Sequence, residues 1–315
     1  MPDRPIIIAT RGSALALAQA NHVFDECRRH FPRLTFEIKI IKTTGDRIQS
    51  ASLAQAGKSL PKGLFTKELE VALLRNQADL AVHSLKDMPT ELPGGLSIGA
   101  VLKRADARDV LVYKDHAQNK GALPQLAEGA LVATSSPRRQ EQLQIARPDL
   151  QVQEIRGNVV TRLEKLVQEE EMAATVLAAA GLARLNFTIN DGLLVGDAVP
   201  EGLRAEFLEL AVMLPCAGQA AIGIEVRSED ARIDSICAPL NHFNSHQAVR
   251  AERRLLAAMG EGCSSPLGAL ATVEGERITL QAVSFLENEM QKVEAKGDVR
   301  EPETLGEEVA NQLRA

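Results

Sequence analysis

Three apolar stretches of this chain, each typical of a β-strand, end at a short loop that contains arginine and leads into a helix-like segment. The loops cover residues 10–13, 134–139 and 156–162. In open α/β sheets, ligands bind beyond the carboxyl ends of the strands, where the free N–H groups of helix N-termini favour anions. The chain has a net charge of −6, so cations gathered at these loops predict a local site for a multiply anionic ligand.

The first hundred residues alternate strand-like and helix-like patterns, which predicts a largely parallel sheet with helices on both faces. We expect strands at residues 5–9, 35–42 and 80–83, and helices at residues 13–29 and 65–76. Ser13 would cap the first of these helices. The glycine pair at residues 94–95 and the charged stretch 103–109 then predict a domain margin.

A second unit begins with a predicted strand at residues 131–133 and a predicted helix at residues 137–146. Pro137 would take the first helical position and Ser136 the cap. The opening junctions of the two units are similar, since Ala-Thr precedes a serine in both, and this hints at two domains of like fold. The residues from 241 onward predict a third, small α+β domain, which a chain of 315 residues can accommodate.

Composition and charge argue against several classes of function. With no tryptophan and one tyrosine, the chain offers little surface for stacking nucleic-acid bases, and its negative charge does not attract nucleic acid. The longest uncharged stretch, residues 172–183, is too short to span a bilayer, and residues 6–9 are too few for a signal-peptide core. Four scattered cysteines and the lack of a His-Glu-x-x-His motif indicate neither a disulfide framework nor a metal site. We therefore expect a cytoplasmic protein that binds neither nucleic acid nor membrane.

Lys86 and Asp87 follow the predicted strand at residues 80–83 and come shortly before Pro89, which disfavours a helix at the residue preceding it. Both side chains are therefore expected on a loop at the carboxyl end of the strand. A carboxylate among cations can stabilise a developing positive charge or relay a proton. The alternative is a turn in which Asp87 caps the backbone and Lys86 is solvated.

Cys263 lies between Gly262 and Ser264, in a loop rich in glycine and serine. A thiol acts as a nucleophile when it is accessible and activated. From its position alone, an inert cysteine in a glycine-rich turn is the simpler explanation.

Arginine recurs at the predicted helix N-termini. Arg138 and Arg139 lie in the first helical turn of the second unit, where positive charge opposes the helix dipole, so they require an anion from a ligand or an acidic neighbour. Asn158 and Arg162, four residues apart, would face the same way. Each arginine alone could belong to a surface ion pair, but the set favours a ligand, because guanidinium binds carboxylate and phosphate bidentately. A P-loop is excluded because Ser52 occupies the position of its first glycine.

The chain contains several short motifs, which follow one another in the order given next. They are Ile8-Ala9-Thr10-Arg11-x-Ser13, Thr44-Gly45-Asp46, Lys62-Gly63-Leu64-Phe65-x-Lys67-Glu68-Leu69-Glu70, Ala81-Val82-His83-Ser84-x-Lys86-Asp87-x-Pro89, Thr134-Ser135-Ser136-x-Arg138-Arg139-Gln140, Arg156-Gly157-Asn158-x-x-Thr161-Arg162, Ala180-Gly181-Leu182-x-Arg184-Leu185, and Gly262-Cys263 with Pro266 and Gly268. On these motifs, the chain resembles the porphobilinogen deaminase family, also called hydroxymethylbilane synthases, over essentially its whole length. Their number and order make a chance match implausible.

The resemblance implies three domains. The first two would be α/β domains like the anion-binding domains of periplasmic binding proteins, with mainly parallel sheets, and the third a small α+β domain that carries a cofactor on a cysteine. The expected ranges are 1–102 with a return segment 206–226 for the first domain, 108–202 for the second and 232–315 for the third. Because one chain would contain the entire site, a monomer is expected.

The resemblance also implies a chemistry. Enzymes of this family are transferases that deaminate porphobilinogen and join four molecules head to tail on a dipyrromethane, releasing hydroxymethylbilane for tetrapyrrole biosynthesis. Here the dipyrromethane would be attached to Cys263 by a thioether. The catalytic Asp87 would bind pyrrole N–H groups, stabilise the cation left by loss of ammonia and move protons. The carboxylates of cofactor and substrate would be bound by basic and hydroxyl side chains, namely Arg11, Ser13, Lys62, Lys86, Thr134, Ser135, Ser136, Arg138, Arg139, Arg156, Arg162 and Arg184.

The chain departs from the family pattern at positions without an assigned chemical role. Residues 57–61 include a short insertion in a loop expected to cover the active site, Ser264 replaces a usual glutamine, and Ala220 replaces a usual glycine. The alternative function, from a different class, is a two-lobed small-anion binding protein without catalysis. Such a protein has no use for Cys263, so a covalent adduct would discriminate between the two functions.

Overall fold

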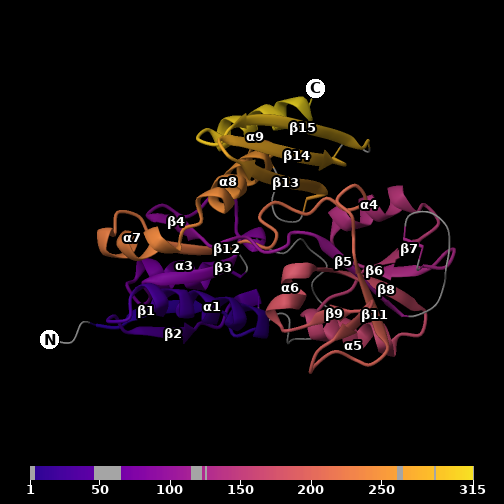
Figure 1. Cartoon of the computed structure of the whole chain (residues 1–315), viewed down its shortest axis with the longest axis horizontal. Helices are drawn as coiled ribbons and strands as arrows, with labels where there is room; N and C mark the ends of the chain where they lie inside the picture. Colours follow the sequence, from indigo (N-terminus) through magenta and orange to yellow (C-terminus); the bar gives the residue numbers. More distant parts are fainter. Residues whose placement is uncertain are drawn as a thin grey trace.

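The chain folds into two side-by-side lobes and a smaller third domain, which lies above them in the view of Figure 1. The fold comes from a computed structural model that describes residues 4–45, 65–114, 123–124, 126–260, 265–286 and 289–314. Each lobe is built on its own β-sheet, and the third domain has a three-stranded sheet. None of the helices in the described ranges has the length and apolar character needed to cross a membrane.

The first domain contains a five-stranded sheet with the order β2-β1-β3-β12-β4. β1 pairs in parallel with β2 and β3, whereas β12 is antiparallel to both β3 and β4. The strands are β1 (Ile6–Thr10), β2 (Phe36–Ile40), β3 (Leu80–Ser84), β4 (Leu96–Val101) and β12 (Ile222–Arg227), and the helices are α1 (Ala14–His30), α3 (Lys67–Leu74) and α7 (Ala231–Cys237). The predicted alternation of strand and helix is confirmed for β1, α1, β2, α3 and β3.

Helix α1 illustrates how the sequence produces this packing. Ser13 caps it as predicted, since the Ser13 hydroxyl accepts a hydrogen bond from the Ala16 N–H at 3.3 Å. Its buried face, spaced at three and four residues, belongs to the same core as β1 and includes Ala20, Val23 and Cys27. The cap and this face fix the N-terminus of α1 at the carboxyl end of β1.

The second domain contains a seven-stranded sheet with the order β7-β6-β8-β5-β11-β10-β9. β6 pairs in parallel with β7 and β8, and the other pairs are antiparallel. The strands are β5 (Asp109–Lys114), β6 (Leu131–Ala133), β7 (Gln151–Gln153), β8 (Met172–Ala178), β9 (Thr188–Asn190), β10 (Leu193–Val195) and β11 (Leu203–Phe207), and the helices are α4 (Pro137–Ala146), α5 (Val159–Gln168) and α6 (Ala179–Arg184). The bounds predicted for β6 and α4 are confirmed.

The chain crosses between the two domains twice, and these crossings explain why both sheets are mixed. After β4 the chain enters β5, inside the second sheet, and after β11 it returns to β12, inside the first. The expected parallel arrangement therefore holds only for β2-β1-β3 and β7-β6-β8. β11 stays in the second sheet up to Phe207, so the return segment begins later than the expected residue 206. The charged margin predicted to end at residue 109 already includes the start of β5.

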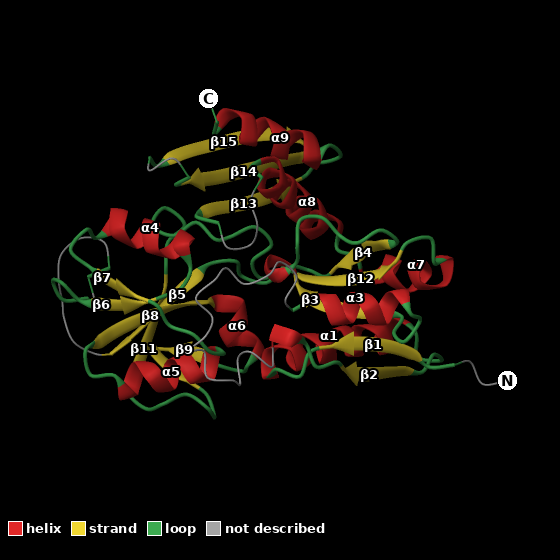
Figure 2. Ribbon diagram, turned by 180° about the vertical axis from the view of Figure 1, so that it is seen from behind, coloured by secondary structure: helices red, strands yellow, loops and turns green. Residues whose placement is uncertain are grey.

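The third domain packs two helices on the sheet β13-β14-β15, as expected for a small α+β unit. It begins after the expected residue 232, because Ile233 and Ile236 of α7 pack in the core of the first domain. Its strands are β13 (Leu267–Glu274), β14 (Arg277–Ser284) and β15 (Gln291–Asp298), and its helices are α8 (Phe243–Ala258) and α9 (Pro302–Gln312). A 3₁₀ segment, η2 (Ala238–Leu240), precedes α8. Helix α8 contacts β13 of its own domain and β4 of the first domain, and Figure 2 shows it between the two. It is therefore the structural link between the third domain and the first.

Candidate active site

Asp87 lies where it was predicted, on a short turn at the carboxyl end of β3. The turn is a 3₁₀ segment, η1 (Leu85–Asp87), that directly follows the strand. Leu85 and Met88 are 1% and 2% exposed and anchor both ends of the turn in a small apolar cluster. The Asp87 side chain is exposed, and within the described ranges no residue donates a hydrogen bond to its carboxylate. The carboxylate is therefore accessible to a ligand and is not used as a local cap by these residues.

The return segment packs closely against this turn because two of its residues are glycines. Gly218 has a φ of +71°, and a Cβ atom added to it would lie 3.1 Å from both Leu85 C and Lys86 N. A Cβ atom on Gly223 would lie 2.5 Å from Leu85 Cδ2. The Leu85 N–H also donates a hydrogen bond to the Ala221 carbonyl at 3.1 Å. The position of Asp87 therefore depends on the second crossing between the domains.

Arg162 of the second domain interacts electrostatically with Asp87 of the first. Burial lowers the pKa of Arg162 to about 10 together with the positive charge of Arg139, while the negative charge of Asp87 opposes this shift. Arg162 Nε donates a hydrogen bond to the Gly157 carbonyl at 2.9 Å. The structure thus brings Asp87, Arg139 and Arg162 near one another across the two domains. Because Arg162 is a half-buried cation near the cation of Arg139, a bound anion is favoured at this position.

Arg184, the last residue of α6, joins the second domain to the return segment. Its Nη2 donates a hydrogen bond to the Ala220 carbonyl at 2.7 Å, and burial lowers the pKa of Arg184 to about 10. Helix α6 contacts α1 of the first domain, and Figure 1 shows it at the inner side of its lobe. Arg184 therefore lies where the two lobes meet.

The first junction places Arg11 and Ser13 at the N-terminus of α1. Arg11 is half-buried, and its Cζ lies 4.1 Å from the centre of the Phe65 ring, in a cation–π contact. The fully buried Thr10 donates a hydrogen bond from its hydroxyl to the Ala16 carbonyl at 3.2 Å. The junction therefore holds a basic side chain at the positive end of a helix, where an anion is favoured.

Two hydroxyl groups of the second junction bind backbone groups of the protein, one in the loop itself and one in the segment that follows β7. Ser135 Oγ donates to the Ile155 carbonyl at 2.7 Å and accepts from the Ile155 N–H at 3.0 Å. Thr134 Oγ1 accepts from the Ser136 N–H at 3.2 Å. Ser136 takes the predicted N-cap position of α4, but its hydroxyl makes no capping hydrogen bond. Two of these three hydroxyl groups therefore order the loop in this structure.

Arg138 and Arg139 bind an anion that belongs to the protein. Arg138 Nη2 lies 2.8 Å from Asp109 Oδ2, and Arg139 Nη2 lies 2.7 Å from Asp109 Oδ1. Arg138 Nη1 donates to the Leu214 carbonyl at 2.6 Å, and Arg139 Nη1 donates to the Val176 carbonyl at 2.7 Å. Of the two anions that the sequence left open, ligand or acidic neighbour, the acidic neighbour is present in the structure.

Asp109, the first residue of β5, is 0% exposed. Burial alone would raise the pKa of Asp109, but the charges and hydrogen bonds of Arg138 and Arg139 outweigh it and hold that pKa well below its ordinary value. Gln219 Nε2 donates a further hydrogen bond to Asp109 Oδ1 at 2.9 Å. The sequence analysis missed Asp109, although arginine at a helix N-terminus indicated that an acid was needed.

The third junction differs from its prediction. Arg156 is exposed, and its Nη2 lies 3.4 Å from Glu154 Oε2. Asn158 is the N-cap of α5, and its Oδ1 accepts a hydrogen bond from the Thr161 N–H at 2.9 Å. Asn158 therefore caps α5, whereas the sequence had predicted it as a residue of the helix itself.

Lys62 and Cys263 lie outside the described residues. The described residues that flank Cys263 are Gly260, which follows α8, and Ser265, which precedes β13. Cys263 therefore follows, in the chain, the helix that contacts the first domain. The roles assigned to Lys62 and Cys263 stay predictions.

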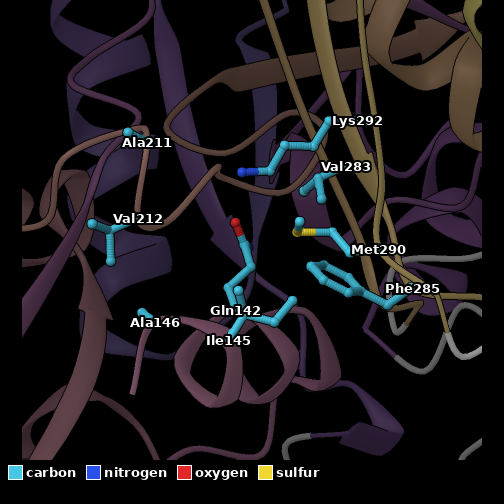
Figure 3. A pocket seen from close by; sticks show the side chains of 9 residues that line it. All are labelled: Gln142, Ile145, Ala146, Ala211, Val212, Val283, Phe285, Met290 and Lys292. Carbon is cyan, nitrogen blue, oxygen red and sulfur yellow. The ribbon is translucent and has the colours of Figure 1, made fainter. Parts of the chain in front are cut away.

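A hollow lies away from these junctions, between α4 and the third domain. Figure 3 shows Gln142 and Ile145 of α4 on one side and Val283, Phe285 and Lys292 on the other. None of the predicted site residues lines it. In the part of the chain that the structure describes, no group of three or more His, Cys, Asp or Glu side chains could hold a metal ion. We therefore assign the candidate active site to the region where the two lobes face each other, at Asp87 and Arg162.

Two protein-family models match the chain, porphobilinogen deaminase, dipyromethane cofactor binding domain, over residues 6–235, and porphobilinogen deaminase, C-terminal domain, over residues 246–315. The porphobilinogen deaminase of Desulforudis audaxviator is 45% identical over 312 residues, which cover 98% of this chain and 94% of the relative. The porphobilinogen deaminase of Moorella thermoacetica is 44% identical over 312 residues, 98% of this chain and 93% of the relative. Among solved structures, the probable amino-acid ABC transporter extracellular-binding protein ytmK of Bacillus subtilis matches 75% of this chain and 90% of its own, with a TM-score of 0.43 and 9% identity.

Proposed function

The chain belongs to the porphobilinogen deaminase family, and we propose that it deaminates four porphobilinogen molecules and joins them head to tail, releasing hydroxymethylbilane and ammonia. It is a transferase of tetrapyrrole biosynthesis, and its two periplasmic-binding-protein-like lobes and C-terminal α+β domain match the architecture that the resemblance implies. The observation that carries the mechanism is the exposed carboxylate of Asp87 at the carboxyl end of β3, which interacts electrostatically with the half-buried cation of Arg162 in the second domain.

The residues of the site fit a dipyrromethane cofactor. Burial and, after it, the positive charge of Arg139 lower the pKa of Arg162, so the cationic form of Arg162 is disfavoured where it lies. A ligand with several carboxylates stabilises this cationic form and pairs with the guanidinium groups. We propose that the cofactor is attached to Cys263 by a thioether, and that when bound it supplies the pyrrole carbon to which the first substrate unit is joined.

Asp87 is the proposed catalytic residue. Its carboxylate would accept hydrogen bonds from pyrrole N–H groups and stabilise the positive charge that develops as ammonia leaves the substrate. It would also accept or relay the proton lost when the new carbon–carbon bond forms. The buried anchors on either side, Leu85 and Met88, would hold the carboxylate in one place during these steps.

The remaining site residues are proposed to bind carboxylates. For Arg138 and Arg139, direct contact with a ligand requires that a ligand carboxylate compete with Asp109, which already binds both. The exposed Arg156 meets no such competitor except the 3.4 Å contact with Glu154. The proposed set otherwise comprises Arg11, Ser13, Lys62, Lys86, Thr134, Ser135, Ser136, Arg162 and Arg184.

We further propose that the protein works as a monomer in the cytoplasm. The proposed site draws on all three domains of one chain, so a second copy is not needed to complete it. Cys27, Cys216 and Cys237 are free thiols, which is the usual state of cysteine in a reducing compartment.

The alternative, a two-lobed small-anion binding protein, is tested by the intact mass of the purified chain. The proposed function predicts an added mass of two linked pyrrole units on the parent and on the Cys216→Ser control, and none on Cys263→Ser. Cys216 is a suitable control because it is a free, half-buried thiol. A parent that carries no adduct, and acquires none on incubation with porphobilinogen, would support the alternative.

A further inference from the structure

Arg253, on helix α8 of the third domain, reaches the turn that carries Asp87. Its Nη2 donates hydrogen bonds to the Pro89 carbonyl at 2.6 Å and to the Thr90 carbonyl at 3.2 Å. Its Nη1 lies 3.4 Å from the Met88 carbonyl. One guanidinium group therefore binds the three consecutive carbonyls that follow Asp87.

The same face of α8 also holds the turn by apolar contacts. Val249, four residues before Arg253 and hence on the same side of the helix, is 1% exposed and belongs to the cluster of Leu85 and Met88. Leu85 and Met88 lie immediately on either side of Lys86 and Asp87. Helix α8 thus fixes the side chains that flank Lys86 and the proposed catalytic Asp87, as well as the backbone beyond them.

The guanidinium of Arg253 also interacts electrostatically with a buried acidic group. Burial lowers the pKa of Arg253, and the negative charge of Glu225 opposes this shift. Glu225 lies on β12, is 0% exposed and has its Oε2 2.9 Å from His83 Nε2 on β3. A planar guanidinium that donates to three carbonyls is held in a single orientation, because its hydrogen bonds have fixed directions.

The neighbouring residue, Glu252, fixes the other side of the turn. Its Oε2 accepts a hydrogen bond from the Gly218 N–H at 2.7 Å, and its Oε1 accepts one from the Ala271 N–H at 2.7 Å. Gly218 is the residue whose missing Cβ leaves room for Lys86. Two consecutive residues of α8 therefore hold both backbone segments that surround Asp87.

We propose that Arg253 is a positioning residue that sets the location of the Asp87 carboxylate and couples the third domain to the reaction. This inference rests on the proposed function of Asp87. Arg253 contacts carbonyl groups of the turn, whereas the cations proposed to bind carboxylates lie on other elements. Its loss should therefore lower kcat and leave KM nearly unchanged.

The test compares Arg253→Met and Arg253→Lys with Arg254→Met. Arg254 is the adjacent, exposed residue and forms an ion pair with Glu307 at the outer side of α8. We expect Arg253→Met to lower kcat by about 10²-fold, the size of effect that follows a small misplacement of a catalytic group. Arg253→Lys should restore only part of kcat, because an ammonium cannot bind three carbonyls in one plane. Arg254→Met should leave kcat unchanged.

Hydrogen exchange gives a readout that does not depend on turnover. In Arg253→Met, amides of residues 84–91 should exchange faster, while those of β13 and β14 should keep the parent rates. Unchanged kcat and exchange would overturn the inference, and so would faster exchange throughout the third domain, which indicates a general loss of stability. Asp87→Asn, measured in parallel, separates the two claims: normal turnover of that variant contradicts the proposed function, whereas normal turnover of Arg253→Met alone contradicts only this inference.

Discussion

The first and second domains both place arginine where a strand turns into a helix, but the two junctions differ in what binds the charge. In the second domain, Arg138 and Arg139 share the buried carboxylate of Asp109. In the first domain, Arg11 is half-buried and stacks on Phe65. The same local pattern can therefore serve internal pairing in one domain and, as we propose, ligand binding in the other.

The two crossings of the chain explain this difference. Each crossing strand carries an acid that is 0% exposed, Asp109 on β5 and Glu225 on β12. Asp109 pairs with the arginines at the N-terminus of α4, whereas Glu225 pairs with His83 on β3. The acid of β5 therefore neutralises the second junction from within the protein, and the acid of β12 is paired elsewhere.

Of the substitutions that test this difference between the two junctions, Asp109→Asn should have the largest effect on stability. Removing this carboxylate leaves Arg138 and Arg139 buried without a counter-ion, which is expected to cost about 3–5 kcal/mol in the free energy of unfolding. Denaturant unfolding measures this loss. The matched control is Asp106→Asn, because Asp106 pairs with Arg108 at the surface and should cost at most about 1 kcal/mol. Equal losses for the two variants would contradict the comparison.

Asp109 also predicts a dependence of stability on pH. The pKa of Asp109 is lowered in the folded chain, so its contribution is fully present above about pH 4, the ordinary aspartate range, and is lost as the pH falls towards the lower, folded-state pKa. The parent should therefore lose stability in acid more steeply than Asp109→Asn. Parallel acid-unfolding curves for the two proteins would show that Asp109 is not held ionised.

A second test compares the loss of the Arg11 side-chain charge with the loss of the Arg138 side-chain charge. Arg11→Met should raise the KM for porphobilinogen about tenfold, the value of one charged hydrogen bond, while the free energy of unfolding falls by no more than about 1 kcal/mol. Arg138→Met should do the reverse and mainly lower stability, because its guanidinium binds Asp109 and the Leu214 carbonyl. Steady-state kinetics and denaturant unfolding of both variants decide between these outcomes. A purely structural Arg11 would lower stability and leave KM unchanged.

The smallest predicted effect concerns the return crossing that joins the two domains. Ala220 has a φ of +68°, a conformation that costs a residue with a Cβ about 1–2 kcal/mol. Ala220→Gly removes this strain from the folded state, but the greater backbone entropy of glycine in the unfolded state offsets part of the gain. The free energy of unfolding should therefore rise by up to about 1 kcal/mol. Ala217→Gly, at a buried position nearby, should lower it instead. Thermal unfolding compares the two, and destabilisation by Ala220→Gly would show that the Ala220 methyl group is needed.

Local signals in the sequence predicted local elements well. Pro137 marks the start of α4, and the Ser13 cap the start of α1, because caps and first-turn residues act within a few positions. The mixed sheets were not predicted, since the pairing of β12 with β3 and β4 joins residues more than 120 positions apart. The order of local patterns carries no information about which strand a returning segment will join.

In the candidate site, too, local signals were predictive and contacts between distant residues were not. The location of Asp87 was predictable because a strand and Pro89 bracket it in sequence. Asp109 and Arg253 were not, because their importance lies in contacts with Arg138 and with the Pro89 carbonyl, which are distant in sequence.

The most direct test of this account is the intact mass of Asp87→Asn after incubation with porphobilinogen, measured beside the parent. Asp87 is exposed, so the substitution should change the free energy of unfolding by no more than about 0.5 kcal/mol. The parent should give a series of masses, each one pyrrole unit larger than the last. Asp87→Asn should carry no pyrrole units beyond those attached before the incubation. The same series and the same release of hydroxymethylbilane from both proteins would contradict the assignment of Asp87 as the catalytic residue.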